Sequence, residues 1–169
     1  MGQSIQDGDF RVNGAFSAKS INYPADSIGD SDIEQDAGIQ ATKVIHQHAL
    51  HLDQAAGSDV VAQTRLVHTF RGDATLVAVS VVTAVAPTGG DKELTVDVQL
   101  GNESTGFATI LTAPITVDAT HANREVVAGV LDITAAAPGD TLEIIIAVAG
   151  STGSQGQGVC VTVWVRETP

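Results

Sequence analysis

The sequence predicts an all-β protein, with an antiparallel β-sandwich or jelly roll of about seven or eight strands behind an extended, mostly irregular N-terminal arm. Three observations support this fold class. Apolar and polar residues alternate with period two through most of the chain after residue 58, clusters of Gly, Pro, Asp and Ser separate the alternating runs, and no run with a helical period interrupts them. We therefore divide the chain into an arm, residues 1–58, and a β-sandwich domain, residues 59–169.

The arm is poor in regularly spaced apolar residues. In "DFRVNGAFSAKSINYPAD", residues 9–26, Gly, Ser, Asn and Asp separate single apolar residues, and Pro24 cannot donate a backbone hydrogen bond. Nine acidic and three basic residues lie between Met1 and Asp59. Such a segment buries too little apolar surface to fold alone, so we expect its ordering to need a partner surface.

Seven strands are expected in the β-sandwich domain. They cover residues 60–71, 75–86, 94–100, 107–117, 124–132, 142–148 and 159–165. The clearest alternation is in "LTVDVQL", "LEIIIAV" and "VCVTVWV", where apolar residues share one face of each strand. Turn sequences such as "PTGGD" and "GSTGSQGQG" separate the runs. Burying one Val or Ile side chain contributes about 1.5 to 3 kcal/mol, so these stripes can fold the domain without the arm.

The composition excludes several classes of partner. Twenty acidic residues against eight basic ones give a formal net charge of −12, so phosphate backbones and anionic lipid headgroups would repel the chain. The longest nearly unbroken apolar run, Leu76–Ala86, has 11 residues, fewer than the roughly 18 that span a bilayer. Cys160 is the single cysteine, so no intrachain disulfide can form. We therefore expect a soluble protein, folded in the cytoplasm, with no nucleic-acid or membrane partner.

Three of the five histidines, His46, His48 and His51, lie within six positions in "GIQATKVIHQHALH". In a strand His46 and His48 would share one face and His51 would point away, whereas in a helix His48 and His51 would share a face. Neither geometry gathers all three, and His68 and His121 stand in other runs without ligand-like spacing. We therefore expect no metal ligand and no cofactor. The alternative is a metalloenzyme that binds metal through the three clustered histidines.

No catalytic residue can be assigned from the sequence either. The chain has no Gly-x-Ser-x-Gly elbow, and Cys160 alternates with valines, as a buried thiol in a strand does. The acidic string "DSIGDSDIEQD" lacks the Gly and Glu that a calcium-binding EF-hand loop needs, and Ser31 with Glu34 fits a helix capping box instead. These features favour a non-enzymatic protein.

Residues 27–48, "SIGDSDIEQDAGIQATKVIHQH", resemble the N-terminal arm of small capsid decoration, or head-fibre-like, proteins of tailed bacteriophages and related prophages. In those proteins a phrase of the form Asp-Ala-Gly-Ile-x-Ala-x-Lys-Leu-x-His precedes a compact β-rich domain. Here the phrase reads Asp36, Ala37, Gly38, Ile39, Ala41, Lys43, Val44 and His46, with Val44 in the place of Leu. The resemblance implies a virion protein, assembled in the host cytoplasm, that sits on the outside of the head as a homotrimer and clamps neighbouring major capsid subunits.

The same segment predicts how the arm is anchored. Its backbone can pair with an exposed strand edge while its apolar residues and its cation fill pockets. We assign arm anchoring to Ile39, Lys43, Val44, Ile45, Leu50 and Leu52. A carbohydrate-binding β-sandwich module, such as a phage appendage, is the alternative function, although only 4% of the residues are aromatic and sugar sites usually use several flat aromatic faces.

Overall fold

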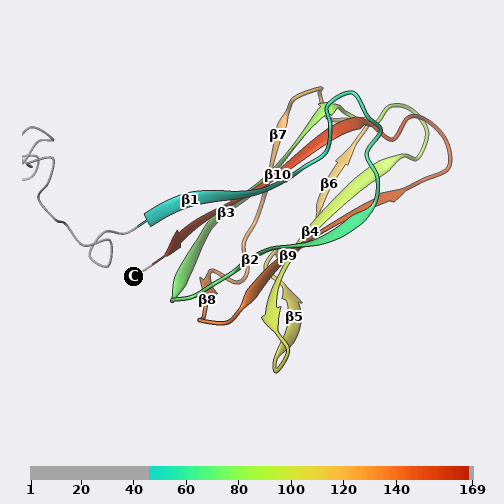
Figure 1. Ribbon diagram of the computed structural model, residues 1–169. Helices are drawn as coiled ribbons and strands as arrows, with labels where there is room; N and C mark the ends of the chain where they lie inside the picture. Colours follow the sequence, from blue (N-terminus) through green and yellow to red (C-terminus); the bar gives the residue numbers. More distant parts are fainter. Residues whose placement is uncertain (1–45, 168–169) are drawn as a thin grey trace, which may run out of the picture. The chain divides into compact units, whose positions relative to one another are not determined.

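The computed structural model describes residues 46–167, which form two antiparallel β-sheets packed against each other (Figure 1). This arrangement confirms the predicted all-β sandwich. The described residues contain no helix, and therefore none that is long and apolar enough to cross a membrane.

The two sheets have five strands each. The first sheet contains β1 (His46–Asp53), β10 (Gln157–Glu167), β3 (Ala74–Val85) and β7 (Val126–Gly129) in that order, with β8 (Ala135–Ala136) also paired to β3. The second sheet contains β2 (Gln63–Thr69), β9 (Thr141–Ala149), β4 (Glu93–Asn102) and β5 (Gly106–Thr109) in that order, with β6 (Ile115–Asp118) also paired to β4. The consecutive strands β9 and β10 lie in different sheets, so the chain crosses between the layers.

The predicted runs correspond closely to the strands, with one division. β2, β3, β4, β7, β9 and β10 each fall at a predicted run. The run 107–117 instead contains two strands, β5 and β6. Pro114, which has no backbone N–H, lies between them, and Leu111 forms an isolated bridge with Leu131. The chain therefore leaves the second sheet for a short stretch in the middle of this run.

The sandwich begins before the domain boundary predicted at residue 58. β1 lies in the segment assigned to the arm, yet it pairs along its whole length with β10, from His46 opposite Glu167 to Asp53 opposite Cys160. His48 stands where an apolar residue would extend the stripe of Leu50 and Leu52, so the strand pattern in the sequence is weak here. The rest of the predicted arm, residues 1–45, lies outside the described residues.

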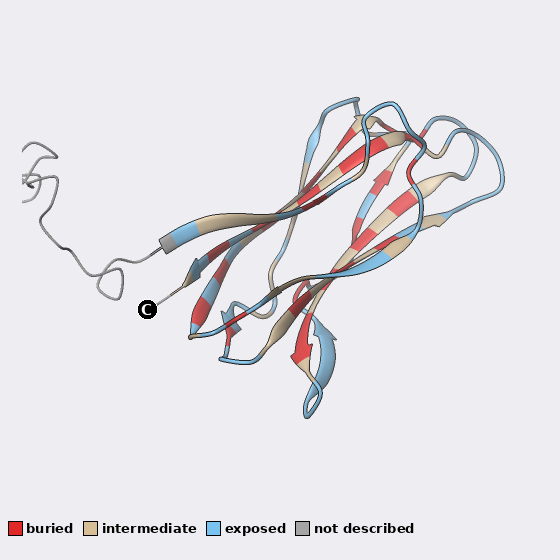
Figure 2. Ribbon diagram, in the orientation of Figure 1, coloured by how far each residue is buried: buried red, intermediate tan, exposed pale blue. Residues whose placement is uncertain are grey.

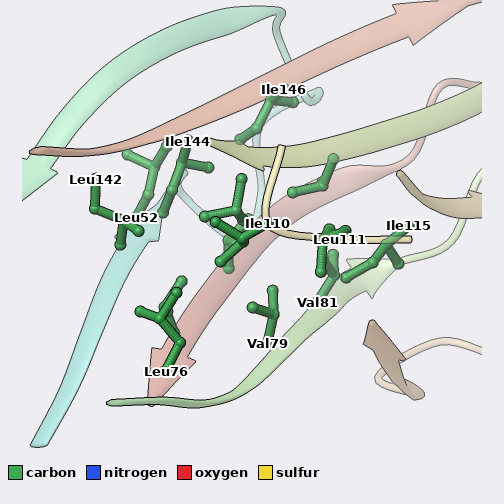
Figure 3. Close-up of a cluster of buried hydrophobic side chains, with 14 of the residues drawn as sticks. Leu52, Leu76, Val79, Val81, Ile110, Leu111, Ile115, Leu142, Ile144 and Ile146 are labelled. Carbon is green, nitrogen blue, oxygen red and sulfur yellow. The ribbon is translucent and has the colours of Figure 1, made fainter. Parts of the chain in front are cut away.

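Side chains that alternate along the strands build one core between the sheets (Figure 2). The longest inward stripes are Leu94, Val96 and Val98 of β4, Leu142, Ile144 and Ile146 of β9, and Val161, Val163 and Val165 of β10, each at most 2% exposed. Side chains from both sheets, including Leu52 of β1, Leu76 of β3 and Ile144 of β9, meet in this cluster (Figure 3). The three stripes that the sequence marks most clearly are therefore the centre of the core.

Hydrogen bonds join the loop between β3 and β4 to the loop between β9 and β10. The Asp91 carboxylate accepts hydrogen bonds from the backbone N–H of Thr152 at 2.7 Å, from the Thr152 hydroxyl at 2.9 Å and from the backbone N–H of Ser151 at 2.8 Å. These hydrogen bonds lower the pKa of Asp91 from 3.8 to about 2, with the Thr152 backbone N–H as the largest cause. Gly150 has a φ of 87°, and a Cβ there would collide with the Asp91 carbonyl, so the loop needs glycine at this position.

The core stripes predict a large difference between two leucine substitutions. Leu94 is fully buried in β4 and Leu66 is 62% exposed in β2. Leu94→Ala should lower the free energy of unfolding by about 2 to 5 kcal/mol, because it leaves a cavity as well as losing apolar burial. Leu66→Ala should change it by no more than about 0.5 kcal/mol. Urea denaturation of both variants checks this, and equal costs would contradict the assignment of inner and outer faces.

The Asp91 contact predicts a component of stability that depends on pH. Because the folded pKa lies below the ordinary value of 3.8, the contribution of the carboxylate is complete above about pH 4 and is lost as the pH falls through about 2. Wild-type protein should therefore lose stability more steeply over this range than an Asp91→Asn variant. Urea midpoints measured at several pH values check the difference, and parallel pH profiles for the two proteins would argue against the contact.

Candidate functional site

Three side chains with metal-ligating or proton-exchanging groups meet where β1, β2 and β10 come together: His48, His68 and Glu167. His68 Nε2 lies 2.7 Å from Glu167 Oε1, and His48 Nε2 lies 4.0 Å from the same oxygen. One candidate ligand atom from each residue lies within 4.8 Å of the other two. We refer to these three residues as the His–His–Glu cluster.

Strand alternation places His48 and Glu167 on the inner face of the first sheet. Along β10, Val163 and Val165 are buried, and Glu167 is the next residue on that face. Val165 is opposite His48 in the antiparallel register. In β1, His48 shares its face with Leu52, which lies in the core. Both polar side chains therefore stand at the ends of apolar stripes.

A β-bulge in β2 turns His68 toward the same interior. In the register with β9, Leu66 is opposite Glu143. His68 is opposite the next residue of β9, Leu142, so Val67 is an extra residue in β2. Unbroken alternation would place His68 on the same outer face as the exposed Leu66, whereas Leu142 is completely buried. The bulge therefore moves His68 from the outer face to the inner face.

The cluster has an apolar wall on one side and solvent on the other. The ring of His68 packs edge-on against Phe70, with ring centroids 4.8 Å apart, and Phe70 is buried. The rings of His48 and His68 are 6.0 Å apart at an interplanar angle of 69°. The side chains of His48, His68 and Glu167 are 37%, 27% and 29% exposed, respectively. Packing thus orients the rings while part of each side chain stays exposed to solvent.

This arrangement can hold a proton or a metal ion. At 2.7 Å, His68 Nε2 and Glu167 Oε1 form a hydrogen bond in which the imidazole N–H donates to the carboxylate. Two imidazole nitrogens with one carboxylate oxygen are also a ligand set found in zinc and non-haem iron sites. The positions needed for either role come from three strands and both sheets.

The structure separates the histidines that are clustered in the sequence. His51 is exposed and lies on the face of β1 opposite to His48, as strand geometry predicts. The sequence predicts neither partner of His48. Glu167 continues the alternation of the valines in β10, so the sequence contains a signal for its face, but His68 needs the bulge at Val67, which the pattern does not reveal.

The residues assigned to arm anchoring divide into two groups. Leu52 is 2% exposed within the core, and Leu50 is partly buried and packs against it. These two side chains stabilise the sandwich itself, and the assignment of an external contact to them is corrected. Ile39, Lys43, Val44 and Ile45 lie outside the described residues.

Two other surface hollows contain groups with possible chemistry. One, of about 220 Å³, is lined by Asp91, Glu93 and Asp118 among others. Two of these carboxylates have structural contacts: Asp91 joins two loops, and Asp118 holds a turn. Hydrogen bonds from Thr120, and then from His121, lower the pKa of Asp118 to about 2. The other, of about 230 Å³, is mostly apolar and contains Cys160. Neither hollow gathers nitrogen and oxygen ligands as the His–His–Glu cluster does.

No protein-family model, curated protein or solved structure matches this chain.

The contact between His68 and Glu167 predicts a measurable coupling free energy. Replacing both residues by Ala, singly and together, should give a coupling of about 0.5 to 1.5 kcal/mol, because the pair forms one partly buried hydrogen bond. Urea denaturation in the presence of a chelator measures this value without a contribution from metal. Arg166, exposed beside Glu167, is the matched control, and its Ala variant should show no coupling to His68→Ala. Equal coupling for both pairs would contradict the contact.

Proposed function

We propose that this chain is a non-enzymatic virion protein that decorates and stabilises a bacteriophage capsid by binding the outside of the major capsid protein lattice. The proposal starts from the resemblance of residues 27–48 to the arms of capsid decoration proteins. It locates the protein at the capsid surface, with no nucleic-acid or membrane partner. In this proposal the segment before β1 binds the capsid, and the sandwich forms the bulk of the protein on the capsid surface.

The observation that carries the proposal is that the resembling segment, residues 27–48, runs directly into the sandwich. The last residues of this segment, His46–His48, are the first residues of β1. Among residues 46–167, β1 ends the strand order of its sheet and is paired on one side only, with β10. A segment that leads into an edge strand can reach a neighbouring surface without disturbing the core behind it.

The described strands form an apolar core among themselves. The described strands bury a continuous apolar cluster between the two sheets, to which the chain before residue 58 contributes Leu50 and Leu52. The two surface hollows described above measure about 220 and 230 Å³, which is below the roughly 300 Å³ at which small-molecule sites begin. These features favour binding through an extended segment over small-molecule catalysis.

The carbohydrate-binding alternative has less support. Among the described residues, Trp164 and Phe107 are the aromatic side chains that are exposed, at 41% and 43%. Trp164 belongs to β10 in the first sheet and Phe107 to β5 in the second sheet. They therefore cannot form one platform for a sugar ring.

We further propose that the protein acts as a homotrimer. β1 and β2 each end the strand order of a sheet, so each has an edge without a strand partner among the described residues. Unpaired edges invite contact with another chain, and a closed symmetric assembly covers them. Many copies on one lattice would also give firm attachment from modest affinity per chain.

Co-sedimentation with undecorated phage heads tests the proposed function. Because β1 begins at His46, a chain that lacks residues 1–45 retains every described strand. This variant should remain soluble and unfold cooperatively, but it should no longer sediment with the heads, whereas the full chain should. Full-length protein with His51→Ala is the control and should bind like wild type. Equal binding by the shortened and full-length chains would overturn the anchoring role and move the contact to the sandwich.

A further inference from the structure

We propose that His48, His68 and Glu167 bind one divalent transition-metal ion of the zinc class, which links the two sheets at the edge where β1 begins. This inference goes beyond the proposed function and does not depend on it. It replaces the expectation of no metal ligand, which considered His46, His48 and His51 as a group and not the three residues that the fold brings together.

The ligand chemistry selects the class of ion. Imidazole nitrogen suits zinc, nickel, copper and iron, and one carboxylate completes a set that zinc sites use with a water molecule in the fourth position. Calcium and magnesium prefer sites built from oxygen atoms, so two nitrogen ligands out of three disfavour them. The cluster should therefore distinguish zinc from calcium and magnesium.

The distances are compatible with a single ion after small side-chain movements. Zinc lies about 2.0 to 2.1 Å from nitrogen and oxygen ligands, so tetrahedral ligand atoms are about 3.3 Å apart. The separations from Glu167 Oε1 are 2.7 Å to His68 Nε2 and 4.0 Å to His48 Nε2. One contact has to open by about 0.6 Å and the other has to close by about 0.7 Å. Partly exposed side chains at strand ends can make such movements by rotation about their side-chain torsions.

The three ligands come from both sheets. β1 and β10 belong to the first sheet and β2 to the second, and within the described part of the chain β1 and β2 each have one paired neighbour. A shared ion would therefore connect two edge strands across the gap between the sheets. β1 follows the N-terminal segment, and a bound ion would reduce fraying of this strand.

Calorimetric titration of the full chain with zinc chloride tests the site directly. The protein should be purified without a nickel column and treated with chelator first. We expect saturable binding of one zinc ion per chain and no comparable binding of calcium or magnesium. Since loss of an outer partner of a metal ligand already weakens affinity about 10- to 100-fold, His68→Ala and Glu167→Gln should each weaken binding roughly tenfold or more.

His51→Ala is the matched control, because His51 lies in the same strand but is exposed on the other face. It should bind zinc as the wild type does. Absence of saturable binding to the wild type would overturn the proposal. An equal loss of affinity in His51→Ala and His48→Ala would overturn it as well, since the ligands would then be the histidines that are neighbours in sequence.

Hydrogen exchange of the wild-type protein provides a test that does not require any variant to fold. Zinc should slow amide exchange in β1 and in β2, which it joins. Exchange in β5 and β6, at the other end of the second sheet, should be unchanged. Unchanged exchange in β1 and β2 at saturating zinc, or equal slowing throughout the domain, would contradict a local link between these strands.

Discussion

The structure depends on one constraint, the alternation of side chains along strands that face each other across a single apolar layer. Successive residues of a strand point to opposite faces, so a slip of one residue would exchange the buried and exposed sides. The stripes of β4, β9 and β10 are complete enough to forbid such a slip. Ile144, for example, is fully buried, and its neighbours on either side point away from the core. The registers of the other strands follow from packing against these stripes.

The His–His–Glu cluster is a consequence of the same constraint. His48 and Glu167 occupy inward positions where the apolar stripes of β1 and β10 end, so their side chains are partly exposed to solvent. His68 joins them only because the extra residue Val67 reverses the parity of β2. A bulge costs regular pairing, and bulges commonly occur where a side chain has to be redirected. The cluster therefore combines two regular positions with one local irregularity.

The sequence predicted those features that depend on alternation within one segment. The fold class, six strand positions and the inward residues of β4, β9 and β10 follow from period-two patterns and turn residues. β1 is hard to predict because its inward residues include His48 as well as Leu50 and Leu52. β8 has only two residues, too few to show an alternating pattern. The partners of His48 depend on register between strands far apart in the chain, and on a bulge, neither of which appears in a local pattern.

Nuclear Overhauser contacts of the His68 imidazole in the full-length protein test the inward orientation of this ring most directly. If the bulge at Val67 turns this ring inward, its protons should give cross-peaks to the ring of Phe70, 4.8 Å away between centroids, and weaker ones to the ring of His48, 6.0 Å away. Cross-peaks to the exposed side chain of Leu66 instead, with none to Phe70 or His48, would place His68 on the outer face and contradict the account.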